Sequence, residues 1–346
     1  MPARQEISPM EALLVGRLPI GKDWRYEPKW DGFRCLAYKR NHTITLRSKS
    51  GKPLERYFPD IVSVLEKLAA TNFVLDGELL VKGESGYSFS DLQMRLHPAE
   101  TRVNMLAQKQ PATFVLFDIL ETEKGINLMA LPLSKRRRFV EQFWKKYCTK
   151  EKAIKLSPQT DSMAEAMKWL HSPGWYIDGI VAKKRTDVYV PGQRVMQKYK
   201  RIRTADCVVG GFRYGTDSNE VGSLLLGLYD NAGRLNHVGF TSSIAKSDKP
   251  SLTKKLETLI HEPGFTGNAP GAPSRWSTER SAEWKPLLPQ IVVEVSFDHV
   301  TDHRFRHGTK LVRFRPDKSP RQCTMEQLDD GERKRTSSHL ASQAMS

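Results

Sequence analysis

Apolar residues recur with two different periods along the first two hundred residues of the chain. Short apolar or alternating runs predict β-strands, and they fall at residues 34–38, 43–47, 73–81, 111–120 and 195–200. Ile61, Leu65 and Leu68 recur at helical spacing, which predicts an amphipathic helix within residues 58–70. This mixture of strands and flanking helices is typical of an α+β fold.

A second helix is expected to begin near Ser134, a residue type suited to the N-cap. Its apolar face would be made by Val140, Phe143, Trp144 and Tyr147. The basic run at residues 135–138 could touch phosphates, but a run of this kind is more often a solvated helix face. We therefore expect these four side chains to face water.

The character of the sequence changes around residues 203–206, where short strands separated by glycine-rich turns begin. Strands are expected at residues 208–212, 223–229, 235–240, 291–297 and 311–314, with a helix near 251–261. This count predicts a small five-stranded barrel of the oligonucleotide-binding (OB) type. We therefore expect domains at residues 1–203 and 204–324, followed by a polar, serine-rich tail at 325–346 that should be disordered.

Charge and cysteine usage narrow the class of protein. The 346 residues carry a formal net charge of +16, and the pI near 9.6 favours a polyanionic partner, above all nucleic acid. Cys35, Cys148, Cys207 and Cys323 form no Cys-x-x-Cys pair, which speaks against a zinc site or a disulfide framework. Since no run of about 18 apolar residues occurs, we expect a soluble cytoplasmic protein without a membrane span.

The segment from Glu27 to Arg34 is the strongest candidate for chemistry. Pro28 stiffens the backbone before Lys29, and the turn dipeptide Asp31-Gly32 follows it, so Lys29 would sit on a constrained bend. A lysine amine becomes a good nucleophile only after neighbours or a metal ion help it to lose its proton. We therefore expect charged groups to surround Lys29.

Further charged residues interrupt apolar strands. Asp76 and Glu78 flank a glycine inside the run at 73–81, and such buried acids must be paired or bind a cation. Asp178 stands in a similar run at 175–183. Lys198 and Lys200, one residue apart, would share one face of a strand and point at the same group.

These segments together resemble the covalent nucleotidyltransferases, which include ATP-dependent DNA ligases, RNA ligases and mRNA capping enzymes. The motifs Lys-x-Asp-Gly, Asp-Gly-Glu, Phe-Asp, Asp-Gly-x-Val-x-Lys and Lys-x-Lys occur in family order, beginning at residues 29, 76, 117, 178 and 198. Trp284-Lys285-Pro286 and the arginine-rich segments at 304–308 and 313–318 are similar to the bacterial ligases of the end-joining class, ligase C and the ligase module of ligase D. The resemblance covers about residues 22–323.

The resemblance implies a nucleotidyltransferase domain of the ATP-grasp-like ligase type, with antiparallel sheets and flanking helices, followed by the OB barrel. Lys29 would attack the α-phosphate of ATP and carry AMP, which passes to a DNA 5′-phosphate before the 3′-hydroxyl displaces it. The resemblance places nucleotide contacts at Glu27, Lys29, Arg34, Arg47, Glu78, Phe117, Lys183, Lys198 and Lys200. It places a magnesium or manganese ion at Glu78 and Asp178, and further catalytic residues at Arg315, Asp317 and Lys318.

The expected partner is duplex DNA with a nick or break, together with end-joining proteins, and the expected state is a monomer in the bacterial cytoplasm that associates with the nucleoid on DNA. One position departs from the family, because Asp178 replaces the usual glutamate. Its carboxylate would stop about 1.5 Å short, the length of one carbon–carbon bond, unless the strand shifts inward. An RNA ligase, an mRNA capping guanylyltransferase, or a non-catalytic nucleic-acid-binding protein with a degenerate nucleotide site are the alternatives.

Overall fold

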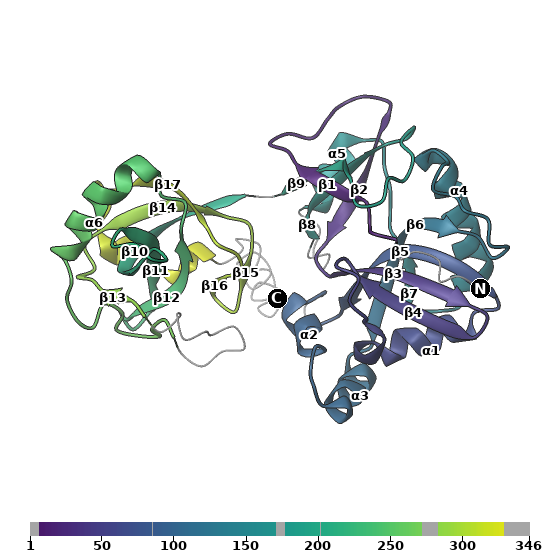
Figure 1. Ribbon diagram of the computed structural model, residues 1–346, viewed down its shortest axis with the longest axis horizontal. Coiled ribbons are helices and arrows are strands. Elements are labelled where there is room, and N and C mark those ends of the chain that lie inside the picture. The colour runs from purple at the N-terminus through teal and green to yellow at the C-terminus, as the bar shows by residue number, and fades with distance from the viewer. Residues whose placement is uncertain (1–6, 85, 171–176, 201, 272–282, 329–346) are drawn as a thin grey trace, which may run out of the picture. The chain divides into compact units, whose positions relative to one another are not determined.

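The computed structural model describes residues 7–84, 86–170, 177–200, 202–271 and 283–328. The chain divides into two compact units, Met1–Arg201 and Ile202–Ser346 (Figure 1). Arg203 already pairs with Phe297 in a sheet of the second unit. Each unit has its own hydrophobic core and is described by itself.

The first unit is built on a five-stranded sheet in the order β4-β3-β5-β6-β7. Its pairs are antiparallel except for β6 with β7, which is parallel. The strand bounds are β3 Phe33–Arg40, β4 Thr43–Ser48, β5 Asn72–Val81, β6 Ala112–Glu121 and β7 Ile154–Leu156. The strands predicted from apolar runs at 34–38, 43–47, 73–81 and 111–120 are therefore confirmed.

Helices cover one face of this sheet. Ile61 and Leu65 of α1 and Val140 of α4 pack with Phe73 and Leu75 of β5 in one apolar cluster. The helix bounds are α1 Pro59–Lys67, α2 Phe89–Met94, α3 Glu100–Lys109, α4 Leu133–Phe143 and α5 Met163–Trp169, with a 3₁₀ turn at Glu55–Tyr57 and a π turn at Trp144–Cys148. The helix predicted within 58–70 is thus confirmed.

The prediction for the basic run at the start of α4 is wrong in part. The α4 helix begins at Leu133, with Pro132 rather than Ser134 at the N-cap. Arg136 is fully buried, and its guanidinium pairs with Asp118 of β6 at 3.0 Å. Arg137 is also buried, and its Nη2 donates to the Ser157 carbonyl at 2.9 Å. These two arginines are buried rather than exposed because segments distant in the sequence supply a carboxylate and a carbonyl as partners.

A second sheet faces the other side of the five-stranded sheet. It has four strands in the order β1-β9-β8-β2, with bounds Glu11–Leu14, Arg194–Lys200, Ile177–Lys184 and Trp24–Trp30 respectively. Leu36, Val74 and Leu120 of the first sheet share an apolar cluster with Met196 of β9. The two sheets therefore pack face to face, and α5 packs against the four-stranded sheet through Ala166 and Trp169.

The second unit contains the five strands predicted for it, in the order β12-β11-β10-β14-β17, and β13 pairs with β10. The bounds are β10 Arg203–Tyr214, β11 Val221–Tyr229, β12 Leu235–Thr241, β13 Lys285–Pro286, β14 Val292–Phe297 and β17 Lys310–Phe314. A hairpin of β15 Val300–Thr301 and β16 Arg304–Phe305 and helix α6 Lys249–Glu257 complete it, with 3₁₀ turns at Lys246–Asp248, Pro320–Gln322 and Met325–Leu328. Val293, Val295 and Phe297 of β14 lie in its core.

This sheet differs from the predicted barrel at its two edges. Within the described residues, β12 and β17 do not pair as strands and are linked by one isolated bridge between Thr241 and Thr309. The Thr309 N–H donates to the Phe240 carbonyl at 3.1 Å, but the next edge donor, Leu311 N–H, binds the Ser243 hydroxyl at 2.7 Å. Because a side chain takes this donor, the edges meet at one point and the barrel is not closed by a continuous ladder.

The predicted disordered tail begins too early. Met325–Leu328 forms a 3₁₀ turn, and Leu328 is buried in the core of the second unit. The Gln327 side chain accepts a hydrogen bond from the Asp206 N–H at 2.9 Å and donates one to the Asp206 carbonyl at 3.0 Å. These contacts fix residues 325–328, and the rest of the predicted tail, 329–346, lies outside the described residues.

The described residues bear on the predictions about cysteines and membrane spans. All four cysteines are free and buried. No helix in the described ranges is long and apolar enough to cross a membrane.

His237 of β12 is a buried titratable group in the second unit. Its Nδ1 accepts from the Arg304 guanidinium at 2.9 Å, because arginine can only donate. Burial lowers the pKa of His237 to about 3, with help from the positive charges of Arg304 and Arg213. The folded second unit therefore holds this imidazole neutral far below the pH at which a free histidine is protonated.

This burial predicts a pH dependence of stability. Between a pH of about 6.5, where the unfolded chain takes up a proton, and about 3, where the folded chain does so, the unfolded state binds more protons. Stability should thus be full above pH 6.5 and fall by about 1.4 kcal/mol per pH unit below it. Calorimetry from pH 7.5 to 5 should show a steeper loss of melting temperature for the parent than for His237→Gln. Parallel pH profiles would contradict the assignment.

Candidate active site

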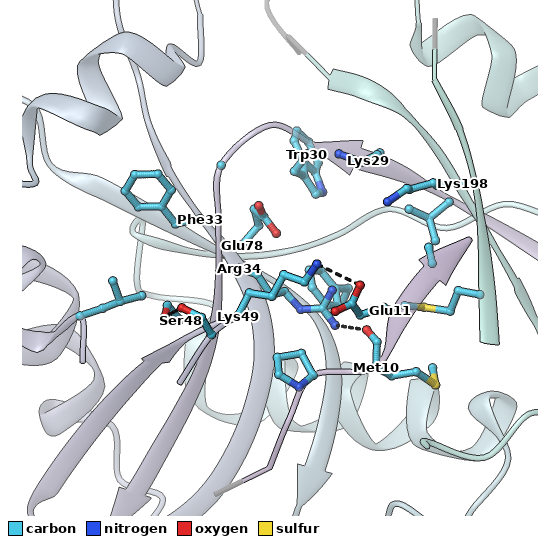
Figure 2. A pocket seen from close by; sticks show the side chains of 18 of the residues that line it. Met10, Glu11, Lys29, Trp30, Phe33, Arg34, Ser48, Lys49, Glu78 and Lys198 are labelled. Carbon is cyan, nitrogen blue, oxygen red and sulfur yellow. Dashed lines mark hydrogen bonds and ion pairs between the residues drawn. The ribbon is translucent and has the colours of Figure 1, made fainter. Parts of the chain in front are cut away.

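A cavity of about 1,220 Å³ lies in the first unit, where its two sheets face each other. Residues of β2, β8 and β9 line it on one side, and residues of β3, β5 and β6 line it on the other. Seven of the predicted site residues are among its lining: Glu27, Lys29, Arg34, Glu78, Phe117, Lys183 and Lys198. Figure 2 shows the amino groups of Lys29 and Lys198 on one side of the cavity, across from the Glu78 carboxylate.

A β-bulge joins Lys29 to Asp178. In the pairing of β2 with β8, Lys29 stands opposite Gly179 and Trp30 stands opposite Ile177, so Asp178 is an extra residue on β8. Bulges re-aim side chains in this way. The Asp178 carboxylate, whose side chain is only 7% exposed, pairs with the Lys29 amine and lies 3.2 Å from the Lys200 amine. The strand irregularity therefore brings the shorter aspartate side chain into contact with Lys29.

Gly179 makes this bulge possible. A Cβ atom at this position would lie 2.0 Å from the carbonyl oxygen of Tyr199 on β9, a distance that no side chain can tolerate. Only glycine lets the neighbouring strand approach this closely. The backbone at residue 179 thus fixes where Asp178 points.

A second ion pair lies deeper in the cavity, between Glu27 of β2 and Lys183 of β8. The Lys183 amine lies 2.6 Å from Glu27 Oε2, and both side chains are buried. Gln159 donates to the other carboxylate oxygen, Oε1, at 3.1 Å. A buried charge pair of this kind is tolerated because both partners are satisfied, and the pair holds the Glu27 carboxylate in one orientation.

A bulge in β6 turns Phe117 into the cavity. Asp76 of β5 stands opposite Asp118 and Gly77 stands opposite Leu116, so Phe117 is left over between them. The Arg34 guanidinium lies 4.5 Å from the centre of the Phe117 ring, and the Lys183 amine lies 4.8 Å from it. Two cations therefore lie within cation–π distance of this ring.

Arg34 is itself fixed by a carboxylate at the base of the cavity. Its Nη2 donates to Asp76 Oδ2 at 2.6 Å, and the Tyr189 hydroxyl donates to the same oxygen at 2.7 Å. Burial works against the charge of Arg34, but Asp76 outweighs it, so the pKa of Arg34 is raised. Most of its donors are therefore used by the protein, and it supports the ring of Phe117.

Glu78 differs from the other acids of the site. Among the described residues, no side chain forms a hydrogen bond or ion pair with its carboxylate. Burial raises the pKa of Glu78 to about 7, although Arg34 and Lys29 pull it down. A nearby cation would relieve this cost, so the carboxylate suits a divalent metal ion.

The number of acidic side chains in the site indicates how a metal ion could be held. No cluster of three or more His, Cys, Asp or Glu side chains that could hold a metal occurs in the part of the chain that the structure describes. Magnesium commonly uses one or two carboxylates and completes its shell with water and substrate phosphates. Glu78 fits this pattern, whereas Asp178 is already engaged by two lysines.

Two family models match the chain. One, described as ATP dependent DNA ligase domain, matches residues 15–200, and the other, ATP dependent DNA ligase C terminal region, matches residues 217–318. The chain belongs to the ATP-dependent DNA ligases. It is therefore an enzyme that uses ATP, and an mRNA capping enzyme, an RNA ligase and a non-catalytic binding protein are set aside as alternatives.

Curated relatives agree with this assignment. The ligase is 36% identical to DNA ligase C of Mycobacterium tuberculosis over 344 residues, covering 95% of both chains. It is also 36% identical to DNA ligase C2 of Mycolicibacterium smegmatis, covering 95% of this chain and 96% of that one. The multifunctional non-homologous end joining DNA repair protein LigD of Mycobacterium tuberculosis is 30% identical over 310 residues, which cover 88% of this chain and 37% of LigD.

Solved structures share the fold. A structure from an analysis of Lig E DNA ligases matches with a TM-score of 0.57 at 15% identity, covering 90% of this chain and all of the other. The structure titled Pmar-Lig_PreS3 matches with a TM-score of 0.60 at 17% identity, covering 84% of this chain and 63% of the other.

Some predicted residues of the ligase lie away from the cavity. Arg47 of β4 is not part of the lining and pairs with Glu55 at 2.7 Å. Lys200 is also outside the lining and reaches the site through Asp178. Lys198 lines the cavity, and burial together with Lys29 and Lys200 lowers the pKa of its amine.

Sequence reasoning missed two partners in the site, Gln159 and Tyr189, and gave a third, Asp76, no named partner. Gln159 follows β7 in a connecting segment, Tyr189 lies between β8 and β9, and Asp76 was recognised only as a buried acid. Gln159 and Tyr189 stand in no motif and in no apolar pattern, so nothing in the sequence marks them. The acidic strand at 73–81 did predict that Asp76 must have a cationic partner.

The predicted residues of the second unit converge on one carboxylate. Asp206 of β10 accepts from Arg315 Nη1 at 2.9 Å and from Lys318 at 2.8 Å. Arg315 also donates to Asp317, and this contact lowers the pKa of the Asp317 carboxyl to about 2. Asp206, which sequence reasoning missed, therefore orders the three residues.

The close approach at Gly179 predicts a sharp mutational effect. Gly179→Ala should separate β8 from β9, move Asp178, destabilise the first unit by about 1–3 kcal/mol and abolish most self-adenylylation. Urea unfolding and labelling with radioactive ATP would measure the two effects. Gly16→Ala, at a position with nothing within 4 Å of the added atom, is the matched control. Parent-like labelling of Gly179→Ala would contradict the role of the bulge.

Proposed function

We propose that this ligase seals breaks in duplex DNA through AMP carried on Lys29. The observation that carries the proposal is the placement of the Lys29 amine in a large cavity, against a carboxylate that a bulge aims at it. In the first step, the amine would form a bond to the α-phosphorus of ATP while the bond to pyrophosphate breaks. The AMP would then pass to a DNA 5′-phosphate, and the 3′-hydroxyl would displace it.

Asp178 would position the nucleophile. Its carboxylate contacts both Lys29 and Lys200, so it holds one amine while the other balances its charge. The Lys29 amine must lose a proton before it attacks, and Asp178 is the acceptor in contact with it. Holding the amine close to the reactive geometry lowers the activation free energy, because less entropy is lost when the transition state forms.

The adenine ring would stack on Phe117, which the β6 bulge turns into the cavity. Glu27 would accept a hydrogen bond from the adenine amino group, which favours ATP over GTP. Its two oxygens already accept from Gln159 and Lys183, but an ionised carboxylate has about four acceptor sites. We infer that Lys183 acts mainly by orienting Glu27.

The phosphates would meet Lys198 and Lys200, the two lysines that share one face of β9. Glu78 would hold a magnesium or manganese ion, which when bound would neutralise charge on the phosphate oxygens. Arg34 and Arg47 would contact the nucleotide only at its edges. Each already pairs with a carboxylate of the protein, which leaves it few donors for a ligand.

We further propose that residues 1–203 form the nucleotidyltransferase domain and residues 204–324 the OB domain. Arg315, Asp317 and Lys318 of the second domain would orient the pyrophosphate in the first step, already ordered by Asp206. The protein would act as a monomer in the cytoplasm, associated with the nucleoid when it is bound to DNA. The similarity to LigD supports a part in end joining, and with it contact with end-joining proteins.

The nucleophile can be tested directly. After incubation with ATP and magnesium, the parent should gain one AMP, which Lys29→Ala should not gain because the bond-forming amine is missing. Intact-mass measurement reads the adduct. Lys52→Ala, at another lysine of the cavity lining, should keep it. An adduct that persists in Lys29→Ala would remove Lys29 from this role.

The role of the second domain can be separated from its folding. Lys318→Ala should slow self-adenylylation by about a hundredfold, the usual effect of removing one stabilising donor, and should spare sealing of a pre-adenylated nick. Lys310→Ala removes the same charge from an exposed position on β17 and should change neither step. Rapid-quench assays of both steps would check this. Equal losses in both steps would instead indicate damage to the domain.

A further inference from the structure

A second, smaller cavity of about 170 Å³ lies in the first unit and shares no lining residue with the large one. Four arginines line it, together with the neutral donors Ser134 and Gln159: Arg25, Arg137, Arg138 and Arg185. No acidic side chain is part of the lining. Glu141 and Asp161, which are not part of the lining, pair with Arg137 and Arg25, so these two carboxylates face four arginines and the cavity keeps an excess of positive charge that favours an anion.

The backbone holds these arginines in place. Arg25 stands on β2, Arg137 and Arg138 stand in the second turn of α4, and Arg185 follows β8. The Arg185 N–H donates to the Asp23 carbonyl at 2.8 Å, and the Ser134 N–H donates to the Arg185 carbonyl at 3.0 Å. Three segments distant in sequence are thus pinned together, so the cluster is part of the folded unit.

One of the arginines has a buried donor that the protein leaves unused. Arg137, only 9% exposed, spends Nε on Glu141 and Nη2 on the Ser157 carbonyl, but its buried Nη1 has no hydrogen-bond partner among the described residues. The buried Nη1 of Arg25 forms an ion pair with Asp161 at 3.0 Å but makes no hydrogen bond within the described residues. Buried N–H donors without an acceptor are rare because they are costly.

We propose that this arginine cavity binds a phosphate group. A tetrahedral anion presents acceptors in several directions at once, so it would accept from the unused Nη1 of Arg137 and also meet Arg25 and the exposed Arg138 and Arg185. Since a water molecule takes about 30 Å³, the space suits one phosphate with a few waters. It is smaller than the roughly 300–1,000 Å³ of pockets that enclose a whole ligand of nucleotide size.

The phosphate could be free inorganic phosphate or one phosphodiester of the DNA backbone, and both offer the same oxygens. The small cavity is linked to the large site through Gln159 and β2. Gln159 lines it and also donates to Glu27, and Arg25 and Glu27 stand two residues apart on the same face of β2. The phosphate site itself does not depend on the role proposed for Lys29.

The double variant Arg138→Gln/Arg185→Gln tests the site in the full chain. Both positions are exposed, and the variant leaves the buried contacts of Arg137 intact. Its control is Arg102→Gln/Lys109→Gln, which removes two charges from exposed positions of α3. Self-adenylylation of both variants reports whether the first unit is folded. If the double variant does not fold, Arg25→Gln takes its place.

Thermal melting in inorganic phosphate is compared with melting in acetate at equal ionic strength. The parent and the control should show a melting temperature that rises by a few degrees and saturates with phosphate, and the double variant should lose the saturable part. Binding of a nicked duplex is then measured by anisotropy across salt. A salt slope lower by about one than that of the control assigns the site to a DNA phosphate, and an unchanged slope assigns it to the free anion. A double variant that matches the control in both measurements overturns the proposal.

Discussion

The contact between Lys29 and Asp178 is the constraint on which the rest of the first unit depends. It places two opposite charges where two sheets meet, out of reach of most solvent, and Lys200 balances the pair. The same rule governs the neighbouring acids, since Glu27 is matched by Lys183 and Asp76 by Arg34. A buried charge without such a partner is strongly destabilising. The two sheets can therefore enclose a polar cavity because the charges on each sheet are paired within that sheet.

Glu78 differs from these paired acids. Its carboxylate has no ion-pair or hydrogen-bond partner among the described residues, and burial raises its pKa to about 7. The other acids of the site are paired with cations of the protein. A cation that enters with the substrate would pair with Glu78 in the same way. The cost of leaving this acid unpaired in the free ligase is of the kind that binding sites commonly carry.

The sequence predicted the positions of the long strands well, because the apolar runs at 73–81 and 111–120 are bounded by polar turns. It also predicted most of the charged residues that gather in the cavity, since their motifs fall on strands that line it, although Arg47 and Lys200 lie outside the lining. It could not predict how the residues are aimed. Asp178 and Phe117 are both extra residues at bulges, and a bulge depends on the register of two strands that are distant in the sequence.

Burial of Arg136 and Arg137 on α4 escaped prediction for a related reason. Two cations within a basic run at the start of a helix have no local reason to be buried, and partners such as Asp118 of β6 and the carbonyl of Ser157 come from elsewhere in the chain. Likewise, among the residues that the structure describes, the edges of the second sheet are joined by one isolated bridge, between Thr241 and Thr309, because the Ser243 hydroxyl takes the next donor. These outcomes rest on single contacts between distant segments, which periodicity does not report.

The role of the Lys29–Asp178 contact is tested most directly by the rate of self-adenylylation of two variants at Asp178, measured across a magnesium titration. Asp178→Glu keeps the charge that pairs with Lys29, and it should keep most of the parent rate. Asp178→Asn keeps the shape but loses the charge, and it should lose most of the rate at every magnesium concentration. An Asp178→Asn enzyme that is adenylylated at the parent rate would show that the ion pair serves the fold alone, and the central claim would be wrong.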